Sequence, residues 1–336
     1  MDQRNTPVLP AMDASQQLSR RVVALAALAF SVVLHASTPA TVPSELGQGG
    51  TWGAQSWTSG DLDQFGGEPH ARGDASSTLL VRYHYYVSDY DTAKLAPKWV
   101  AHIDTQASAQ AAASRKAGQW DRGQYTFTPD ANVVNYSQAH HLAWVTNADY
   151  TNANPPGLKP VTAKNRITRG HMASNLEMKG HGDDQAGMQS QEESFSFANV
   201  CPQMQGHNAP LWAALENDCL QLAARVGRVA VITGPVYAAD AAHPLLTTEA
   251  PRGKCKVPIP THFFKIIIAS VHGHTEAVAF LVPHLPDLTA EHRFDFAVGV
   301  RKVEEATGIN FMPAMGPNDE VEDHPSDELL DLLQQD

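Results

Sequence analysis

The chain has 336 residues, of which 43% are hydrophobic and 18% are charged, and its formal net charge is −12. This composition predicts a folded globular protein and excludes a disordered, fibrous or repeat architecture. The charge argues against nucleic-acid binding through overall basicity, but it is unevenly distributed. Residues 316–336 contain eight acidic residues and no Lys or Arg, so the rest of the chain carries only −4.

The N-terminal stretch RRVVALAALAFSVVLHA, residues 20–36, joins a basic pair to an apolar run and is followed by small residues. This run of about 15 residues is short for a membrane span and has the layout of a secretory signal peptide. We therefore expect a signal peptide over residues 1–36, with an uncleaved membrane anchor as the alternative. Export predicts a secreted or periplasmic protein with no stable membrane association after signal cleavage.

Residues 37–61 are rich in Gly, Ser, Thr and Pro, which is typical of a flexible linker, and one folded domain is expected over residues 62–315. Within this domain, alternating or continuously apolar runs predict strands. Most of these runs follow one another without an intervening helix, which predicts an antiparallel sheet rather than a doubly wound one. The expected strands are residues 79–91, 97–104, 138–146, 193–200, 227–237, 261–271 and 276–284.

Two helices are expected to pack on this sheet, at residues 210–227 and 301–308. In the first, Pro210 suits the opening turn, apolar residues recur at helical spacing, and Gly227 marks the end. The predicted fold class is therefore α+β, a central antiparallel sheet with helices packed on it. The acidic C-terminal tail, residues 316–336, is expected to be a solvated appendage that contains a short helical turn or two.

The three cysteines are Cys201, Cys219 and Cys255. Export would allow one disulfide, and an odd count leaves one thiol over. Their spacing does not say which two would pair. No CxxC motif is present, so a zinc site built from thiolates is not expected.

An Arg-Gly-His triplet is followed by two asparagines and by a helix that carries a glutamate. In chain order these are Arg169-Gly170-His171, Asn199 with Pro202-Gln203, Asn208, and Trp212 with Leu215-Glu216. This ordered set resembles the signature of the DNA/RNA non-specific endonuclease family, and the resemblance spans residues 62–315. One position departs from the family pattern, because Thr168 stands where an Asp is usual.

The resemblance implies a ββα-metal nuclease fold. It also implies an enzyme that hydrolyses DNA and RNA with little sequence preference, using one Mg²⁺ or, in some cases, Mn²⁺, and leaving 5′-phosphates. Some members of the family form homodimers, and a producing cell can need an inhibitor protein. The alternative is a catalytically weak or silent module that only binds nucleic acid or nucleotides. The presence of both His171 and Asn208 argues against that alternative.

The family pattern assigns a role to each residue of the site, and several of these residues also have an ordinary structural interpretation. His171 would be the general base, since an imidazole titrates near neutrality, although most of the 16 histidines must be structural. Asn208 would be the direct ligand of the metal ion, or only a helix cap. Glu216 would hold metal-bound waters, or would be a solvated helix residue. Arg169 would bind the phosphate, and Asn199 would support the site by hydrogen bonds.

Substrate binding requires local positive charge, because phosphate contacts dominate non-specific affinity for nucleic acids. Lys164, Arg166 and Lys254 are the expected contacts, although each is equally typical of a solvated loop. A zinc hydrolase built from other histidines is a further alternative, but no HExxH motif is present. The histidines considered for it are His140, His141, His181 and His207.

Overall fold

The computed structural model describes residues 57–71, 78–154, 161–239, 245–316 and 320–335. The expected signal peptide and most of the expected linker lie outside these residues. Among the described residues, no helix has both the length and the apolarity that crossing a bilayer requires.

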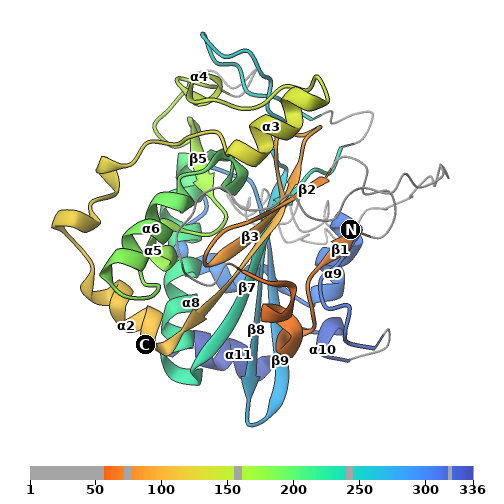
Figure 1. Cartoon of the computed structure of the whole chain (residues 1–336). Helices are drawn as coiled ribbons and strands as arrows, with labels where there is room; N and C mark the ends of the chain where they lie inside the picture. The colour runs from red at the N-terminus through yellow and green to blue at the C-terminus, as the bar shows by residue number, and fades with distance from the viewer. Residues whose placement is uncertain (1–56, 72–77, 155–160, 240–244, 317–319, 336) are drawn as a thin grey trace, which may run out of the picture. The chain divides into compact units, whose positions relative to one another are not determined.

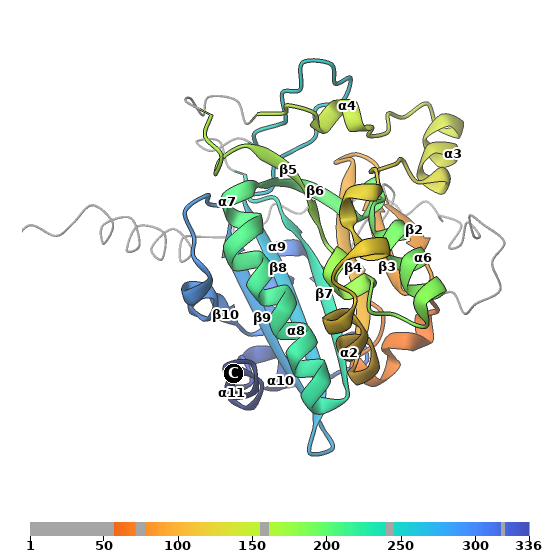
Figure 2. The same ribbon diagram turned by 90° about the vertical axis from the view of Figure 1, so that its left-hand side faces the viewer.

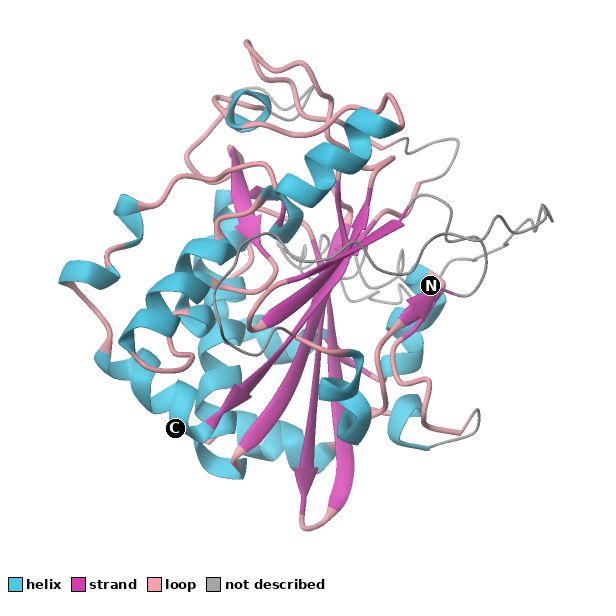
Figure 3. Ribbon diagram, viewed as in Figure 1, coloured by secondary structure: helices cyan, strands magenta, loops and turns pink. Residues whose placement is uncertain are grey.

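The main element is a seven-stranded sheet in the order β10-β9-β8-β7-β4-β3-β2, with every neighbouring pair antiparallel (Figures 1 and 3). The expected antiparallel α+β architecture is therefore confirmed. Two short sheets accompany it, β1 (His70–Ala71) with β11 (Ile309–Asn310), and β5 (Ile167–His171) with β6 (Val200–Met204). The strands of the large sheet are β2 (Thr78–Arg82), β3 (Tyr86–Asp91), β4 (Ala96–Thr105), β7 (Arg228–Val236), β8 (His262–Val271), β9 (His274–Pro283) and β10 (Ala297–Val298).

Helices cover both faces of the sheet, because its central strands are apolar on both sides. On one face, Val100, Val231 and Ile267 pack with Leu215 and Leu222 of the long helix α8 (Ala213–Val226). The helices α2 (Gln106–Ser114), α5 (Asn175–Met178) and α11 (Asp327–Leu333) belong to this layer. The other face packs against the 3₁₀ helix η1 (Ser59–Phe65) and α9 (Val300–Thr307).

Two expected strands are wrong. Residues 138–146 contain the end of α3 (Ala131–Ala139) and a turn, in which His141 has φ = 56°. Residues 193–200 contain the end of α6 (Asp184–Ser194) and a 3₁₀ turn, η4 (Phe197–Asn199), and only then reach β6. Side chains that bond to nearby backbone explain this difference, because Ser196 accepts a hydrogen bond from Ala198 N–H and so favours a turn over a strand.

The acidic tail differs from the solvated appendage that was expected. It forms α10 (Glu320–Asp323) and α11, and Leu329 and Leu333 of α11 are buried in the core that contains α8. These leucines are four residues apart, so they lie on one face of the helix while the acidic residues face outward. Arg301 pairs with Glu322 at 3.0 Å and also with Asp323. The tail is therefore packed as part of the domain.

Candidate active site

The site is built on a unit of two strands and a helix, β5, β6 and α8. Strand β5 runs antiparallel to β6, with His171 opposite Val200 and Arg169 opposite Pro202. After β6 the chain makes the short helix α7 (Gln205–His207) and a π-helical turn, η5 (Asn208–Trp212), and continues into α8. Figure 2 shows β5 and β6 lying across the N-terminal end of this helical segment.

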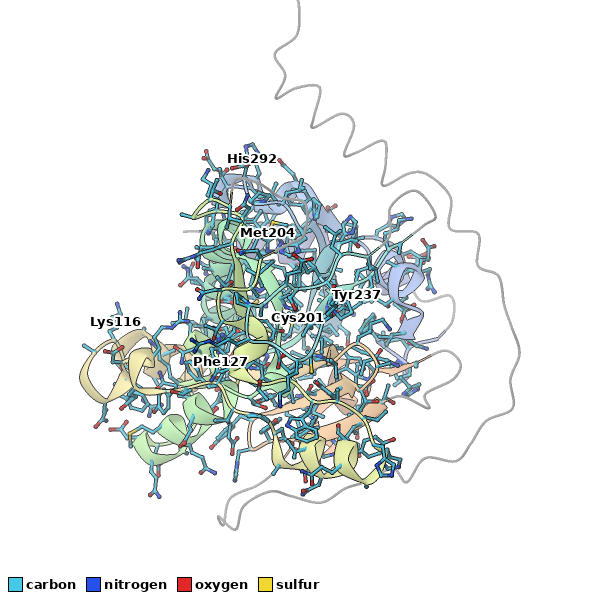
Figure 4. All side chains as sticks on the ribbon, turned by 90° about the horizontal axis from the view of Figure 1, so that it is seen from above. Lys116, Phe127, Cys201, Met204, Tyr237 and His292 are labelled. Atoms are coloured by element: carbon cyan, nitrogen blue, oxygen red, sulfur yellow. The ribbon has the colours of Figure 1, made fainter. Side chains whose placement is uncertain are left out.

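His171 ends β5 in an aromatic setting, with its side chain buried and the ring centroids of Phe127 and Phe195 at 5.0 and 5.1 Å. Burial, with a smaller contribution from the charge of Arg122, lowers the pKa of His171 to about 3. Its Nε2 has no hydrogen-bond partner among the described residues. The imidazole is therefore neutral at pH 7 and has a ring nitrogen that is not committed to another protein group. Figure 4 views this end of the molecule from above, with Phe127 and Cys201 labelled.

Asn199 fixes the chain that follows His171. It is fully buried; its Oδ1 accepts from Ala173 N–H at 2.8 Å, while its Nδ2 donates to the carbonyls of Ala173 and Ser194 at 2.8 and 2.9 Å. All of these bonds go to backbone. The side chain thus ties the segment that follows β5 to the end of α6, and it contacts no solvent.

Gly170 is required by the close approach of β6. A Cβ atom at this position would lie 2.1 Å from Oε1 and 2.6 Å from Cβ of Gln203, which pairs with Thr168 across the ribbon. Thr168, which stands where the family usually has Asp, donates its hydroxyl to the carbonyl of Gln203 at 2.8 Å. The Thr therefore supplies a strand-to-strand hydrogen bond in place of a charge.

His284 holds the far end of β6. Its Nε2 accepts from Met204 N–H at 2.7 Å and its Nδ1 lies 2.8 Å from the Pro260 carbonyl, an arrangement that requires a neutral ring. Burial lowers the pKa of His284 to about 4. Because the unfolded chain binds a proton near pH 6.5, the stabilising contribution of His284 is complete above that pH and is lost as the pH falls toward 4.

We therefore expect the stability difference between the wild type and His284→Gln to be largest at pH 7.5. It should decrease by about 1.4 kcal/mol per pH unit between about pH 6.5 and 4. Urea unfolding at pH 7.5, 5.5 and 4.5 measures this difference, with the exposed His274→Gln as the matched control. A stability difference that does not change with pH would contradict the assignment of a neutral buried ring.

Arg169 lies two residues before His171, so both side chains leave the same face of β5. Its Nη2 donates to the Asn147 carbonyl at 3.2 Å and to the Thr151 hydroxyl at 3.3 Å. The guanidinium carbon is 5.7 Å from the ring centroid of Tyr150. The structure thus anchors this cation on α4 (Asn147–Tyr150) beside the site.

Asn208 and Glu216 lie on the helical side of the unit. Asn208 opens the π-helical turn, a feature that is frequent at functional sites, and its half-buried side chain has no hydrogen bond to another described residue. Burial and the carboxylate of Glu177 raise the pKa of Glu216 to about 8. Without an ion Glu216 is therefore largely protonated at pH 7, and a bound dication would favour its carboxylate form. An amide oxygen and a carboxylate are both hard donors of the kind that Mg²⁺ takes, so these two side chains fit a hydrated divalent ion.

Arg122 is a residue of this region that the sequence reasoning missed. It opens the 3₁₀ turn η3 (Arg122–Gln124), is exposed, and its charge lowers the pKa of both His171 and Glu216. A single cation that acts on both groups lies within electrostatic reach of each. The available signal was an arginine among aromatic residues in the stretch WDRGQYTF, residues 120–127.

The expected substrate contacts are all exposed. Lys164 pairs with Asp287 at 3.1 Å, and Arg166 contacts the side-chain oxygen of Gln205 at 3.5 Å. Lys254 lies on a loop whose backbone is bound to α4, because Lys254 N–H donates to Asp149 Oδ1 at 2.6 Å. Helix α4 therefore supports both this loop and Arg169.

The three cysteines are free thiols, so the disulfide considered from the sequence is absent. Cys201 and Cys219 are buried, and burial raises the pKa of both thiols. Neither belongs to a site with the low thiol pKa that reactive cysteines need.

Comparison with solved structures identifies the same fold elsewhere. The chain superposes on a chain in the crystal structure of the EndoG/EndoGI complex with a TM-score of 0.55 and 23% identity, over 76% of this chain and 92% of that one. The ββα-metal nuclease fold is thus confirmed.

Curated relatives carry nuclease names. The chain is 30% identical over 245 residues to Nuclease EXOG, mitochondrial, of Danio rerio, covering 69% of this chain and 60% of the relative. It is 29% identical over 238 residues to Endonuclease G, mitochondrial, of Homo sapiens, covering 68% and 67%. The chain therefore spans about 60% of the length of the zebrafish relative.

These names correct the expected localisation. The zebrafish and human relatives, and those from Schizosaccharomyces pombe and Saccharomyces cerevisiae, are named as mitochondrial nucleases, so the prediction of a secreted or periplasmic protein is wrong. The signal-peptide interpretation loses its support for the same reason. The interpretation was wrong to rely on a basic pair before an apolar run, because this pattern does not by itself distinguish one kind of targeting segment from another.

The family pattern described as DNA/RNA non-specific endonuclease matches residues 68–317. The match contains the β5, β6 and α8 unit, the residues of the sequence signature, and Arg122. It covers most of the chain, so it extends well beyond a short motif. The chain belongs to the DNA/RNA non-specific endonuclease family.

Proposed function

We propose that this chain is a metal-dependent endonuclease that hydrolyses phosphodiester bonds of DNA and RNA without sequence preference and leaves 5′-phosphates. The observation that carries the proposal is the state of His171. It is a buried, neutral imidazole with an unpartnered Nε2, and it ends β5, which lies beside the N-terminal end of the helical segment that carries Asn208 (Figure 2). A nucleophilic water needs such a group to take its proton.

The roles of the other side chains follow from their positions. Asn208 would hold the ion directly, and Glu216 would accept hydrogen bonds from its waters. The bound ion would neutralise charge that develops on the phosphate and the leaving oxygen. Asn199 keeps β5 in place, so that His171 faces the incoming water without needing to reorient.

Two cations would share the phosphate. Arg169 is anchored beside α4, and its fixed guanidinium suits a bidentate contact with two phosphate oxygens. Arg122 is exposed within reach of both His171 and Glu216, where it would stabilise the charge of the transition state. Lys164, Arg166 and Lys254 would extend the contact along the nucleic-acid backbone and set its salt dependence.

Metal removal tests this function. The purified protein is expected to degrade plasmid DNA and RNA in Mg²⁺, to stop in EDTA, and to recover when Mg²⁺ or Mn²⁺ is added in excess. Direct ligation of the DNA products without prior phosphorylation would report their 5′-phosphates. Cleavage that persists in EDTA would contradict the metal role. Nucleic-acid binding without cleavage in any divalent ion would favour the silent binding module.

The partners of the chain belong to the same proposal. DNA and RNA are the proposed substrates. A homodimer and an inhibitor protein are the further partners that the family resemblance implies. The solved neighbour is an inhibitor complex of EndoG, and that assembly is a property of the neighbour.

A further inference from the structure

A second group of ionisable side chains is buried beneath the helices, close enough to Glu216 that the Glu177 carboxylate raises the pKa of Glu216. His102 and Asp104 lie two residues apart on β4 and point to the face of the sheet that α8 and α5 cover. Glu177 comes from α5, and His181 from the turn after it. The exposed fractions of His102, Asp104 and Glu177 are 0%, and that of His181 is 5%.

Two of the distances between these groups match the edges of a small coordination shell, and the distance to His181 is longer. His102 Nε2 lies 3.4 Å from Glu177 Oε1 and 3.6 Å from Asp104 Oδ2, and His181 Nε2 lies 4.0 Å from Asp104 Oδ1. One donor atom from each of His102, Asp104 and Glu177 can be chosen so that all lie within 4.8 Å of one another. A tetrahedral ion with bonds of about 2.0–2.2 Å has edges of about 3.3–3.6 Å between its ligands.

These donor atoms have no other partner in the part of the chain that the structure describes. His102 Nε2, both oxygens of Asp104, Glu177 Oε1 and His181 Nε2 are buried and make no hydrogen bond. Buried polar atoms are nearly always bonded to protein, water or an ion, so these unbonded atoms around His102, Asp104 and Glu177 point to an occupant.

Neighbouring residues orient Glu177 and the turn that carries His181. Ser174 N–H donates to Glu177 Oε2 at 3.1 Å, which leaves the other oxygen to face His102. Arg115 donates to the carbonyls of Lys179 and His181 at 2.7 and 3.3 Å and so fixes the turn that carries His181. Such outer contacts orient the ligands of metal sites.

The charges are also compatible with a divalent ion. Two carboxylates balance one dication and leave both imidazoles neutral, which is the form that binds a metal. Without an ion, the two carboxylates face the fully buried Lys265, which acts on both, and His102; although burial opposes it, Glu177 and Asp104 raise the pKa of His102 to about 9. The competing state is therefore a protonated His102 between two carboxylates.

We propose that His102, Asp104, Glu177 and His181 form a structural metal site that binds one Zn²⁺ and ties β4 to α5. Two imidazole nitrogens with two carboxylate oxygens suit zinc, whereas Mg²⁺ takes oxygen ligands almost alone. The site shares no ligand with the ion proposed at Asn208. Of the histidines considered for a zinc hydrolase from the sequence, only His181 belongs to it.

The test uses the full chain after EDTA treatment and dialysis, reconstituted with Zn²⁺ or Co²⁺. We expect one tightly bound Zn²⁺ per chain, a higher melting temperature when zinc is bound, and the intense visible bands of tetrahedral Co²⁺. Glu177→Gln and His181→Ala should lose the bound ion and the bands. Asn208→Ala should keep both, because it alters only the other metal site.

His181 is at the rim of the cluster, stacked on Tyr85 at 4.6 Å, so His181→Ala is the variant that should fold most readily. The cobalt spectrum of the wild type tests the proposal without any variant. Weak octahedral bands, no rise in melting temperature with zinc, or retention of the ion by Glu177→Gln would each overturn it in favour of the protonated cluster. Nuclease activity is not used as a readout, so failure here is distinguishable from failure of the proposed function.

Discussion

His171→Ala is expected to lower kcat for plasmid cleavage by about 10²- to 10⁴-fold, the usual contribution of a general base. The reason is that the substitution removes the proton acceptor while Asn208, Glu216 and both arginines stay in place. KM should change little, because a neutral imidazole contributes little to phosphate binding in the ground state. Initial rates over a range of DNA concentrations, in saturating Mg²⁺, separate the two parameters.

The matched control is His274→Ala, which removes an exposed histidine at the β8–β9 turn. Its kcat should equal that of the wild type. Truncating His171 leaves a gap against Phe127 and Phe195, so His171→Asn is made in parallel and the melting temperature of each variant is compared. A folded His171 variant that retains full kcat would refute its role as the base.

Arg122→Ala is expected to lower kcat by about 10²- to 10³-fold, as does the loss of one preorganised group that stabilises transition-state charge. Arg122→Lys keeps the charge but loses the planar fork, so it should recover part of the rate. Removing the cation also removes one influence that lowers the pKa of His171. The acidic limb of the pH–rate profile should therefore shift to higher pH in Arg122→Ala.

Lys116→Ala is the control for this experiment, since it removes an exposed cation from the same segment of chain. It should alter the salt dependence of KM at most. Equal effects of Arg122→Ala and Lys116→Ala would mean that Arg122 acts only through general attraction of the substrate. A change in KM alone would lead to the same conclusion.

The sequence predicts those helices and strands whose structure is set by the side chains of the segment itself. Residues 227–237 and 261–271 are predominantly apolar, and they form the central strands β7 and β8. The expected helix at 210–227 is confirmed as α8, preceded by a π-helical turn. In residues 193–200, by contrast, polar residues alternate with apolar ones because polar side chains such as Ser196 cap a turn, so the pattern does not mark a strand.

The site is less visible in the sequence than the sheet. Strands β5 and β6 are short and contain Gly170 and Pro202, so no periodicity marks them. Family resemblance selected His171, whereas Arg122 lies 49 positions earlier in irregular chain and reaches the region only through folding. The cluster around His102 was missed for the same reason, because its members come from separate elements that only the sheet and α5 bring together.

The pairing of β1 with β11 has a consequence for biosynthesis. His70 and Ala71 meet Asn310 and Ile309, so the two ends of the domain close on each other. A ribosome that has just added Glu216 still needs about 5–20 s, at about 5–20 residues per second, to reach Ile309. On the proposed function, a nascent chain thus carries its whole set of catalytic groups while the scaffold is incomplete. The domain would then become competent against the cell's own RNA only after β11 has been made.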